Sequence, residues 1–492
     1  MDRESRKVSF FRITPWLILF VFTTVYIVVS WKITIRLQPR KVVYYSSASS
    51  SSSSSFLFVF LVMSESADFH EAFAREVVFS GEDSGRRRAF SYDRPPLGFL
   101  LSKLLEGNDR KKLLETGFSC DGSGISSKHC VVDRDMRIDT TTMTVTVAST
   151  AEETVVVRPY ARQEDKPLLQ RVSPVKIIAG KSLPASPCQH NHRIPAVVFS
   201  TSGFVGNVFH EINEIIIPLY ITAKLFETKV QLIAEDYNPR FMKKYSMAFK
   251  SLASSEIINP ETNRSTHCFP GGVVGLKFHG HLAVNSGDVP TGLSTADFRQ
   301  FLRDSFNLKY THVSQIKRPR LLLLSRRATR RFLNEDEMVR TMRELGFEVI
   351  TISRAKTVSN IASFSRIINS CTVFVAAHGA GLTNELFLPD GAVVVQVDLI
   401  GLSWAAAAYY GNPGRAMGLH YLRYQIMPHE SSLWKVFGPE NSRVFTDPNG
   451  TFPTEAGREI YLNGQNVRVD IDRFRETMVE AMSFVRGEDL TT

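Results

Sequence analysis

The sequence lacks the short motifs of common hydrolases, nucleotide hydrolases and kinases. None of its 492 residues forms a Gly-x-Ser-x-Gly, a Walker-type loop or a kinase signature. No His/Cys set has zinc spacing. The two Asp-x-Asp pairs, Asp133-Arg-Asp135 and Asp470-Ile-Asp472, are better explained as solvated surface. We therefore expect a metal-independent site with no cofactor.

Cysteine is also scarce, with five residues in the chain. The candidate disulfide cysteines are Cys120, Cys130, Cys188 and Cys268, the first two being close enough to close a short loop. Disulfides are typical of an oxidising compartment, and five unpaired core cysteines are the alternative. Cys371 lies in an apolar stretch, which predicts a buried thiol. The sequons at Asn263 and Asn449 agree with a lumenal, N-glycosylated body.

Positive charge is unevenly distributed along the chain. The formal net charge is +10, and the first 41 residues, with eight Lys/Arg and two acidic residues, supply +6 of it. A nucleic-acid partner would require basic charge over the folded body. The distribution indicates membrane topology and no nucleic-acid binding.

The uncharged run from Ile13 to Trp31 is about as long as a membrane-spanning helix. We predict a cytosolic tail over 1–12, a transmembrane signal anchor over 13–32 and a type II orientation. A cleaved signal peptide is the alternative, but no small-x-small site follows the run. Residues 46–55 are nine serines and one alanine, which predicts a flexible, weakly structured stem over 33–115.

The remaining chain shows two β-α-β patterns. In the first, strands at 196–200 and 230–234 flank an amphipathic helix over 208–226 that is kinked at Pro218. In the second, strands at 320–325, 347–352, 371–376 and 392–397 alternate with helices. Such alternation predicts parallel sheets covered on both sides. We expect an α/β fold with two Rossmann-like lobes, 116–315 and 316–492, facing a cleft.

Ligands in such sheets bind beyond the carboxyl ends of the strands, and a glycine turn follows one predicted strand there. Its residues are His378, Gly379, Ala380, Gly381, Leu382, Thr383 and Asn384. The glycines permit close backbone approach, and the following helix presents free N–H groups. A diphosphate suits this turn, with His378 donating to a phosphate or sugar oxygen. An ordinary capped β-α turn is the alternative.

A basic segment, Ser325-Arg-Arg-Ala-Thr-Arg-Arg331, follows another strand of the same lobe. The forked donors of Arg326, Arg327 and Arg330 match pyrophosphate oxygens. A solvated helix start or a membrane-surface patch is the alternative. Because this segment and the glycine turn are both loops of one sheet, we expect them to converge on one diphosphate.

The other lobe offers a possible base near the start of its helix. Gly203, Gly206 and Asn207 form an acceptor-side loop, and His210 and Glu211 follow it. If the bound diphosphate belongs to a group donor, transfer of that group to a hydroxyl needs one base to take the hydroxyl's proton, and we assign this role to Glu211, with His210 next. The alternative is a first-turn acid favoured by the helix dipole, with Asn207 as a cap.

Taken in order, these segments resemble glycosyltransferase family 61, most closely its plant xylan arabinosyl- and xylosyltransferases. The matching segments are Cys120-Asp-Gly with Cys130, Arg158-Pro-Tyr-Ala-Arg162, Gly203–Asn207 with Phe209-His-Glu, Pro218-Leu-Tyr, His267-Cys-Phe, Arg318-Pro-Arg with Ser325-Arg-Arg, His378–Asn384, and Tyr424 with Glu430-Ser-Ser-Leu433. They cover about residue 115 to the C-terminus.

The resemblance implies a GT-B fold, an inverting mechanism, a UDP-pentose donor, a xylan acceptor and a Golgi location. Arg326, His378, Gly379, Gly381 and Asn384 match the family's donor-site motifs, and His210-Glu211 matches a segment that usually reads His-Asp. Val205 and Glu385 also depart from the common pattern. A lapsed relative that acts as a structural partner in a Golgi complex is the alternative to an active transferase.

Overall fold

The computed structural model describes residues 95–121, 127–181, 187–287, 289–438 and 442–487. All of them belong to one compact unit, Ser91–Thr492. The predicted tail, anchor and most of the predicted stem lie outside the described residues. Among the residues described, no helix is long and apolar enough to cross a bilayer.

The predicted stem extends too far toward the C-terminus. Helices α3 (Leu97–Ser102) and α4 (Gly107–Thr116) occupy its last part. This segment buries Leu101, Leu105 and Leu113 in the core. Single apolar side chains spaced along these short helices, rather than a long apolar run, pack the segment against the folded body.

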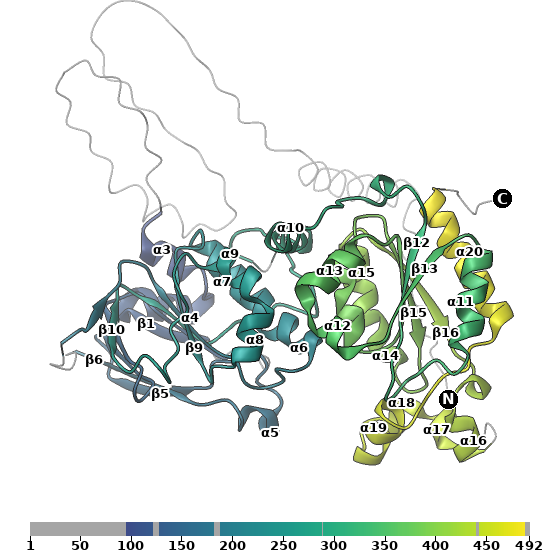
Figure 1. Cartoon of the computed structure of the whole chain (residues 1–492). Helices are drawn as coiled ribbons and strands as arrows, with labels where there is room; N and C mark the ends of the chain where they lie inside the picture. Colours follow the sequence, from purple (N-terminus) through teal and green to yellow (C-terminus); the bar gives the residue numbers. More distant parts are fainter. Residues whose placement is uncertain (1–94, 122–126, 182–186, 288, 439–441, 488–492) are drawn as a thin grey trace, which may run out of the picture. The chain divides into compact units, whose positions relative to one another are not determined.

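The C-terminal half contains a five-stranded parallel sheet in the order β13-β12-β14-β15-β16 (Figure 1). Its strands are β12 (Arg320–Leu324), β13 (Glu348–Ile352), β14 (Val373–Ala377), β15 (Val393–Asp398) and β16 (His420–Gln425). The four strands predicted here agree with β12 to β15 to within two residues at each end. β16 was not predicted.

Helices cover both faces of this sheet, as the alternation of apolar side chains requires. Leu321 and Leu323 pack with α11 (Glu335–Glu344) and α20 (Ile471–Arg486). Leu322 and Leu324 point to the opposite face, into the core that contains α13 (Ile361–Asn369). The smaller helical elements of this half are η3 (Val313–Gln315), α12 (Ala355–Ser359), η4 (Ala380–Phe387), α14 (Ser403–Ala406), η5 (Ala407–Gly411), α15 (Asn412–Ala416), η6 (Pro428–Glu430), α16 (Leu433–Phe437), α17 (Arg443–Thr446), α18 (Pro448–Thr451) and α19 (Glu455–Leu462).

The N-terminal half contains two sheets, where the sequence predicted one. The first has the order β1-β2-β11-β8-β9, in which the β11–β8 and β8–β9 pairs are parallel and β2 pairs antiparallel with both β1 and β11. Its strands are β1 (Phe118–Asp121), β2 (His129–Val132), β8 (Ala196–Ser200), β9 (Gln231–Glu235) and β11 (Gly272–Val274). The Rossmann-like prediction therefore holds for the β8-to-β9 unit and not for the whole lobe.

The second N-terminal sheet is mixed, with six strands in the order β5-β6-β4-β3-β10-β7. They are β3 (Met136–Asp139), β4 (Thr144–Ala148), β5 (Glu153–Val157), β6 (Val175–Gly180), β7 (His190–Asn191) and β10 (Thr266–Phe269). Its buried side chains pack on the first sheet. Burial alternates along β3, β4 and β6, so these strands lack the continuous apolar runs that predicted the parallel ones.

The helix after β8 was predicted to be amphipathic, but the structure buries it on nearly all sides. It comprises α6 (Val208–Glu211), a π-helical turn η2 (Ile212–Ile216) and α7 (Ile217–Leu225), and all of η2 is buried. Pro218 lies in the first turn of α7, directly after η2, where the wider π-helical turn already interrupts the i→i−4 hydrogen bonds that a proline cannot continue. The helix is buried all round because it packs between β8 and the elements that follow it. The other helices of this half are α5 (Lys166–Leu169), α8 (Pro239–Lys244) and α9 (Ser246–Leu252).

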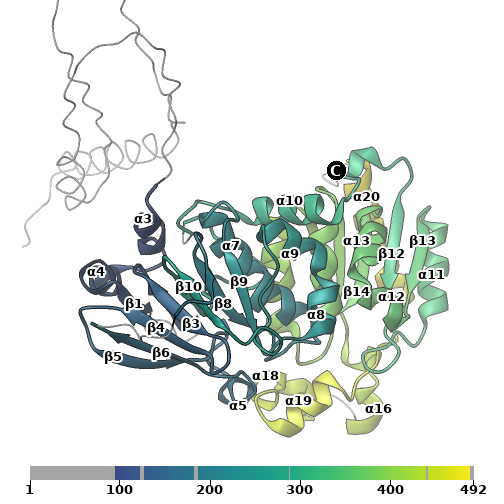
Figure 2. The same ribbon diagram turned by 60° about the vertical axis from the view of Figure 1, so that its left-hand side comes forward.

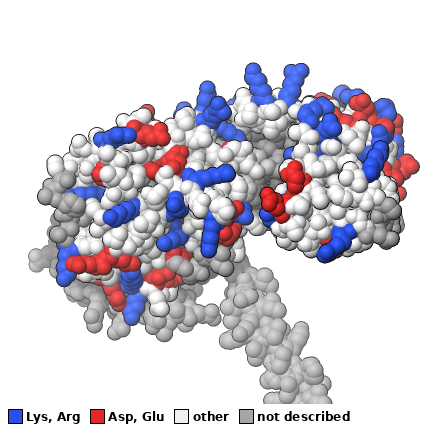
Figure 3. All heavy atoms as spheres, turned by 90° about the horizontal axis from the view of Figure 1, so that it is seen from below, with Lys and Arg blue, Asp and Glu red and all other residues white. Residues whose placement is uncertain are grey.

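The two halves are joined by a shared core and by α10 (Thr295–Phe306), which contacts α9 on one side and η4 and α13 on the other (Figure 2). Cys120 is bonded to Cys130 and Cys188 to Cys268, while Cys371 is a buried thiol. On the face in Figure 3, basic and acidic side chains lie side by side over both halves.

Candidate active site

The strand order of the C-terminal sheet places a crevice between β12 and β14. This 2-1-3-4-5 order reverses direction between those strands, and ligands bind at such a switch point. A cavity of about 860 Å³ lies there. It is lined by the loops after β12 and β14 and, from the N-terminal half, by the loop after β8. The structure thus brings the three predicted segments together.

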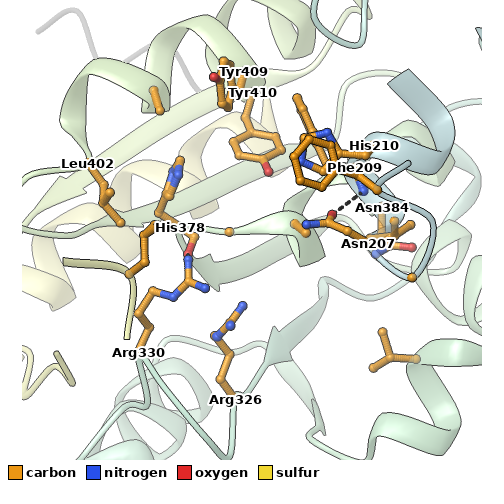
Figure 4. Close-up of a pocket in the computed structure, with 18 of the residues that line it drawn as sticks. Asn207, Phe209, His210, Arg326, Arg330, His378, Asn384, Leu402, Tyr409 and Tyr410 are labelled. Carbon is orange, nitrogen blue, oxygen red and sulfur yellow. Dashed lines mark hydrogen bonds between the residues drawn. The ribbon is translucent and has the colours of Figure 1, made fainter. Parts of the chain in front are cut away.

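Two arginines reach into this cavity from the loop after β12 (Figure 4). The Arg326 Nε–H donates to the carbonyl of Thr329 at 2.9 Å, and an Arg330 Nη1–H donates to the carbonyl of His378 at 3.2 Å. The Nε of Arg330 is buried without a hydrogen-bond partner. Burial, then the charge of Arg326, lowers the pKa of Arg330 to about 10. In the described part of the chain neither guanidinium has a carboxylate partner, so both favour an anion in the cavity.

Gly379 lets these guanidinium groups approach the backbone. Its φ of 148° lies in a region that L side chains rarely adopt, and a Cβ there would lie 2.9 Å from Nη1 of Arg326 and 3.0 Å from Nη1 of Arg330. The 3₁₀ helix η4 begins at the next residue, and the first N–H groups of a helix have no acceptor within it. A helix was predicted after this turn, and the structure makes it 3₁₀ rather than α.

His378 is held as a neutral hydrogen-bond donor. Its pKa is lowered to about 3, mainly by burial and then by Arg330 and Arg326. The Gln396 side-chain amide donates to Nδ1 of His378 at 3.1 Å and to Oδ1 of Asp398 at 2.7 Å. Because Nδ1 accepts, the ring proton lies on Nε2, which can donate to a phosphate oxygen.

The other predicted donor residues divide into two groups. Ala380 and Asn384 line the cavity, and the Asn384 amide donates to the Gly381 carbonyl at 2.8 Å. Gly381, Leu382 and Thr383 do not line it. Gly381 serves packing, since a Cβ there would lie 2.6 Å from a methyl group of Leu324.

Arg327 also lies apart from the cavity lining, contrary to prediction. It is exposed, donates to the Ser353 hydroxyl at 2.9 Å and lies 3.8 Å from a Glu335 oxygen. Alternate residues of an irregular loop face different directions, so three neighbouring arginines do not all converge.

The loop after β8 forms the opposite wall. Gly206 and Asn207 line the cavity, and the Asn207 side chain caps α6 by accepting from the Phe209 N–H at 3.0 Å. Gly203 does not line the cavity; its φ is 73°, and a Cβ there would lie 2.7 Å from the Tyr160 ring. The loop therefore needs glycine at 203 for packing and conformation.

His210 lines the cavity and is oriented by a buried carboxylate. Its Nδ1 lies 2.6 Å from Oε1 of Glu214, which is 1% exposed, and its ring stacks on Phe204 at 4.2 Å. The Tyr160 hydroxyl donates to the other oxygen of Glu214, and Arg162 Nη1 lies 3.5 Å from Oε1. Glu214 binds the Nδ1 proton, which leaves Nε2 as the proton acceptor.

The structure argues against Glu211 as the base. Its side chain is 3% exposed and does not line the cavity. The carboxylate accepts from the Gly206 N–H at 3.0 Å, the Tyr245 hydroxyl at 2.9 Å and the Lys244 ammonium group. It anchors the loop instead. The sequence could not show this, because Lys244 and Tyr245 lie more than 30 positions further on.

The cavity also has an aromatic wall that was not predicted. Trp404, Tyr409 and Tyr410 follow β15 on α14 and η5, and Phe452 follows α18. The rule that selected the loops after β12 and β14 also applies to the loop after β15. That loop has a single glycine, Gly401, and no charge cluster, so its sequence does not indicate a phosphate site.

Comparison with known proteins agrees with this site. The family model described as Glycosyltransferase 61 matches residues 208–395, from α6 to β15. The xylan glycosyltransferase MUCI21 of Arabidopsis thaliana is 31% identical over 75% of this chain and 79% of its own length. In Oryza sativa subsp. japonica, the α-1,3-arabinosyltransferase XAT2 is 33% identical over 74% of this chain and 64% of its own, and the β-1,2-xylosyltransferase XYXT1 is 34% identical over 67% and 72%.

A two-sided cavity with unpaired cations on one wall and an oriented imidazole on the other is the site of a group-transfer enzyme. The chain belongs to glycosyltransferase family 61 and is a glycosyltransferase.

Proposed function

We propose that this protein is an inverting pentosyltransferase of GT-B type that moves arabinofuranose or xylose from a UDP-sugar to the xylan backbone or its side chains. One observation carries the proposal: Arg326, Arg330 and His378 share a single cavity with His210. The relatives named for xylan glycosyl-, arabinosyl- and xylosyltransfer support the sugar and the acceptor.

In the proposed reaction an acceptor hydroxyl attacks the anomeric carbon and the bond from that carbon to the phosphate oxygen breaks. His210 Nε2 takes the hydroxyl proton, and Glu214 stabilises the imidazolium that results. The bonding electrons leave with UDP. The Arg326 and Arg330 guanidinium groups and the His378 Nε2–H stabilise the added charge on the diphosphate, a role that a metal ion has in other transferases.

We further propose that the body lies in the Golgi lumen behind an anchor at 13–32, with a tail over 1–12 and a stem that ends before α3. The two disulfides favour an oxidising compartment. Asn449 is exposed on α18 and fits glycan attachment, whereas Asn263 is half-buried and its amide oxygen accepts from the Ser265 hydroxyl.

The test is a panel of UDP-arabinofuranose, UDP-xylose and UDP-N-acetylglucosamine with xylohexaose, using the full-length chain in detergent. We expect transfer from one UDP-pentose, and loss of UDP binding in Arg326→Ala. Arg327→Ala is the matched control, because this neighbouring arginine does not line the cavity, and it should bind UDP normally. Equal UDP affinity in both variants would overturn the donor assignment, and transfer from the hexosamine donor alone would overturn the pentose.

A further inference from the structure

A continuous row of aromatic rings leads from His210 to the open rim of the cavity. Its members are Phe209, Tyr409, Trp404 and Phe452. Ring centroids are 5.3 Å apart for His210 and Phe209, 5.1 Å for Phe209 and Tyr409, 5.7 Å for Tyr409 and Trp404, and 5.4 Å for Trp404 and Phe452. His210 and the four members of the row all line the cavity. The row thus joins the proposed base to the surface.

Trp404 is the exposed member of this row. It is 46% exposed, although an indole of that size gains free energy from burial. The edge contacts with Tyr409 and Phe452 hold it in place. A large aromatic face kept open in the cavity wall is suited to a ligand with one apolar face, as a pyranose ring has in its C–H groups.

Polar groups lie at the same end of the cavity, on or beside α19. Arg458 donates to the Pro453 carbonyl at 2.8 Å, and the Asn463 amide donates to Glu459 at 2.7 Å. Both are exposed, line the cavity and keep further donors for a ligand. An aromatic face beside planar hydrogen-bonding groups matches the alternating apolar and hydroxyl surfaces of a sugar chain.

The sheet order separates this end from the nucleoside. Ala355, Val358 and Ile361 also line the cavity, and they follow β13 on α12 and α13. In the sheet, β13 and β15 lie on opposite sides of the β12–β14 pair, whose loops hold the proposed diphosphate. The residues after β15 are the ones continuous with His210 through the aromatic row. This arrangement leaves the side of the cavity next to β13 for the donor's nucleoside and the side next to β15 for the acceptor.

We propose that Trp404 is a specificity-determining residue that stacks on a xylose unit of the acceptor chain, away from the unit whose hydroxyl reacts. This inference rests on the proposed function, because it takes the acceptor to be a xylan chain. Affinity should then depend on acceptor length, because short acceptors fill only the space beside His210 and longer ones also reach Trp404.

The experiment is calorimetric titration of the full-length chain, saturated with UDP, with xylobiose and xylohexaose, in wild type, Trp404→Ala and Trp404→Phe. Trp434→Ala is the matched control, because Trp434 contacts Phe445 on the C-terminal half and does not line the cavity. Loss of one aromatic stack should weaken xylohexaose binding about tenfold in Trp404→Ala. Trp404→Phe should restore part of the affinity, and xylobiose and UDP affinities should not change.

Equal xylohexaose affinity in Trp404→Ala and wild type overturns the inference, as does a loss of UDP affinity, which would place the nucleoside on Trp404. Binding is measured without turnover, so the two claims separate. If wild type binds xylohexaose but transfers no sugar, the proposed function fails. The affinities of wild type and Trp404→Ala for xylohexaose and xylobiose still test whether Trp404 stacks on the longer chain. If wild type binds no xylohexaose, both fail.

Discussion

At the scale of single residues, neighbours fix what each site side chain can do. His378 stays neutral because it is buried beside two cations, and Arg330 stays charged at neutral pH even with its pKa lowered to about 10. Their positions after two strands could be predicted, because Gly-rich and Arg-rich loops there suit a diphosphate. The pairing of His210 with Glu214 follows from their i,i+4 spacing, but Tyr160, 54 positions before Glu214, could not be inferred.

The two glutamates of the helix after β8 should behave differently when their charge is removed. Glu211→Gln keeps oxygen and size beside Gly206 and Tyr245 but loses the ion pair with Lys244. We expect it to cost about 1–3 kcal/mol of unfolding free energy and to retain most of the transfer rate. Urea unfolding and initial rates measure both effects.

Glu214→Gln is the comparison for that variant, with the same substitution one helical turn further on. It removes the carboxylate that orients and stabilises His210, so its turnover should fall on the order of a hundredfold or more. If Glu211→Gln lost as much turnover as Glu214→Gln, Glu211 would be the base after all.

At the scale of elements, α10 fastens the donor turn. Arg299 of this helix is 1% exposed, and its guanidinium donates to the carbonyls of Leu386, Leu388 and Met417 and pairs with Asp390. Two of those carbonyls lie at or just past the end of η4, where a helix leaves its last acceptors unpaired. α10 is therefore part of the support of the donor site, although it lies outside the strands that form it.

Arg299→Met should leave these three carbonyls without their donor and Asp390 with Arg303 as its remaining partner, while filling most of the volume. Breaking a buried, multiply bonded charge costs about 3–5 kcal/mol, so we expect a marked fall in the thermal midpoint. The exposed neighbour Gln300 on the same helix provides the control variant Gln300→Met. A midpoint shift no larger than the control's would show that α10 does not fasten η4 in this way.

Elements with one buried face were harder to predict than those buried on both faces. The parallel strands β12, β14 and β15 are runs of apolar residues and could be placed closely. The strands of the six-stranded sheet are short and alternate, and their pairing joins segments as distant as β3 and β10. The all-round burial of α7 depends on tertiary contacts that no local period reveals.

At the scale of the whole molecule, the function depends on two halves of different construction meeting at one cavity. The C-terminal half is a doubly wound sheet whose switch point holds the proposed diphosphate site. The N-terminal half is a two-sheet body that contributes the loop after β8, the start of α6, Arg162 and Lys244. That these segments converge was predictable from the rule for strand ends. The aromatic row was not, because it is assembled from three separate segments.

The most direct measurement is the transfer rate of His210→Gln with a UDP-pentose and xylohexaose, together with UDP affinity on the same preparation. Loss of the proton acceptor should lower the rate by about 10²–10⁴-fold and leave UDP affinity unchanged, because His210 lies across the cavity from Arg326 and Arg330 (Figure 4). A rate within tenfold of wild type would show that the proton leaves by another route and would contradict the account.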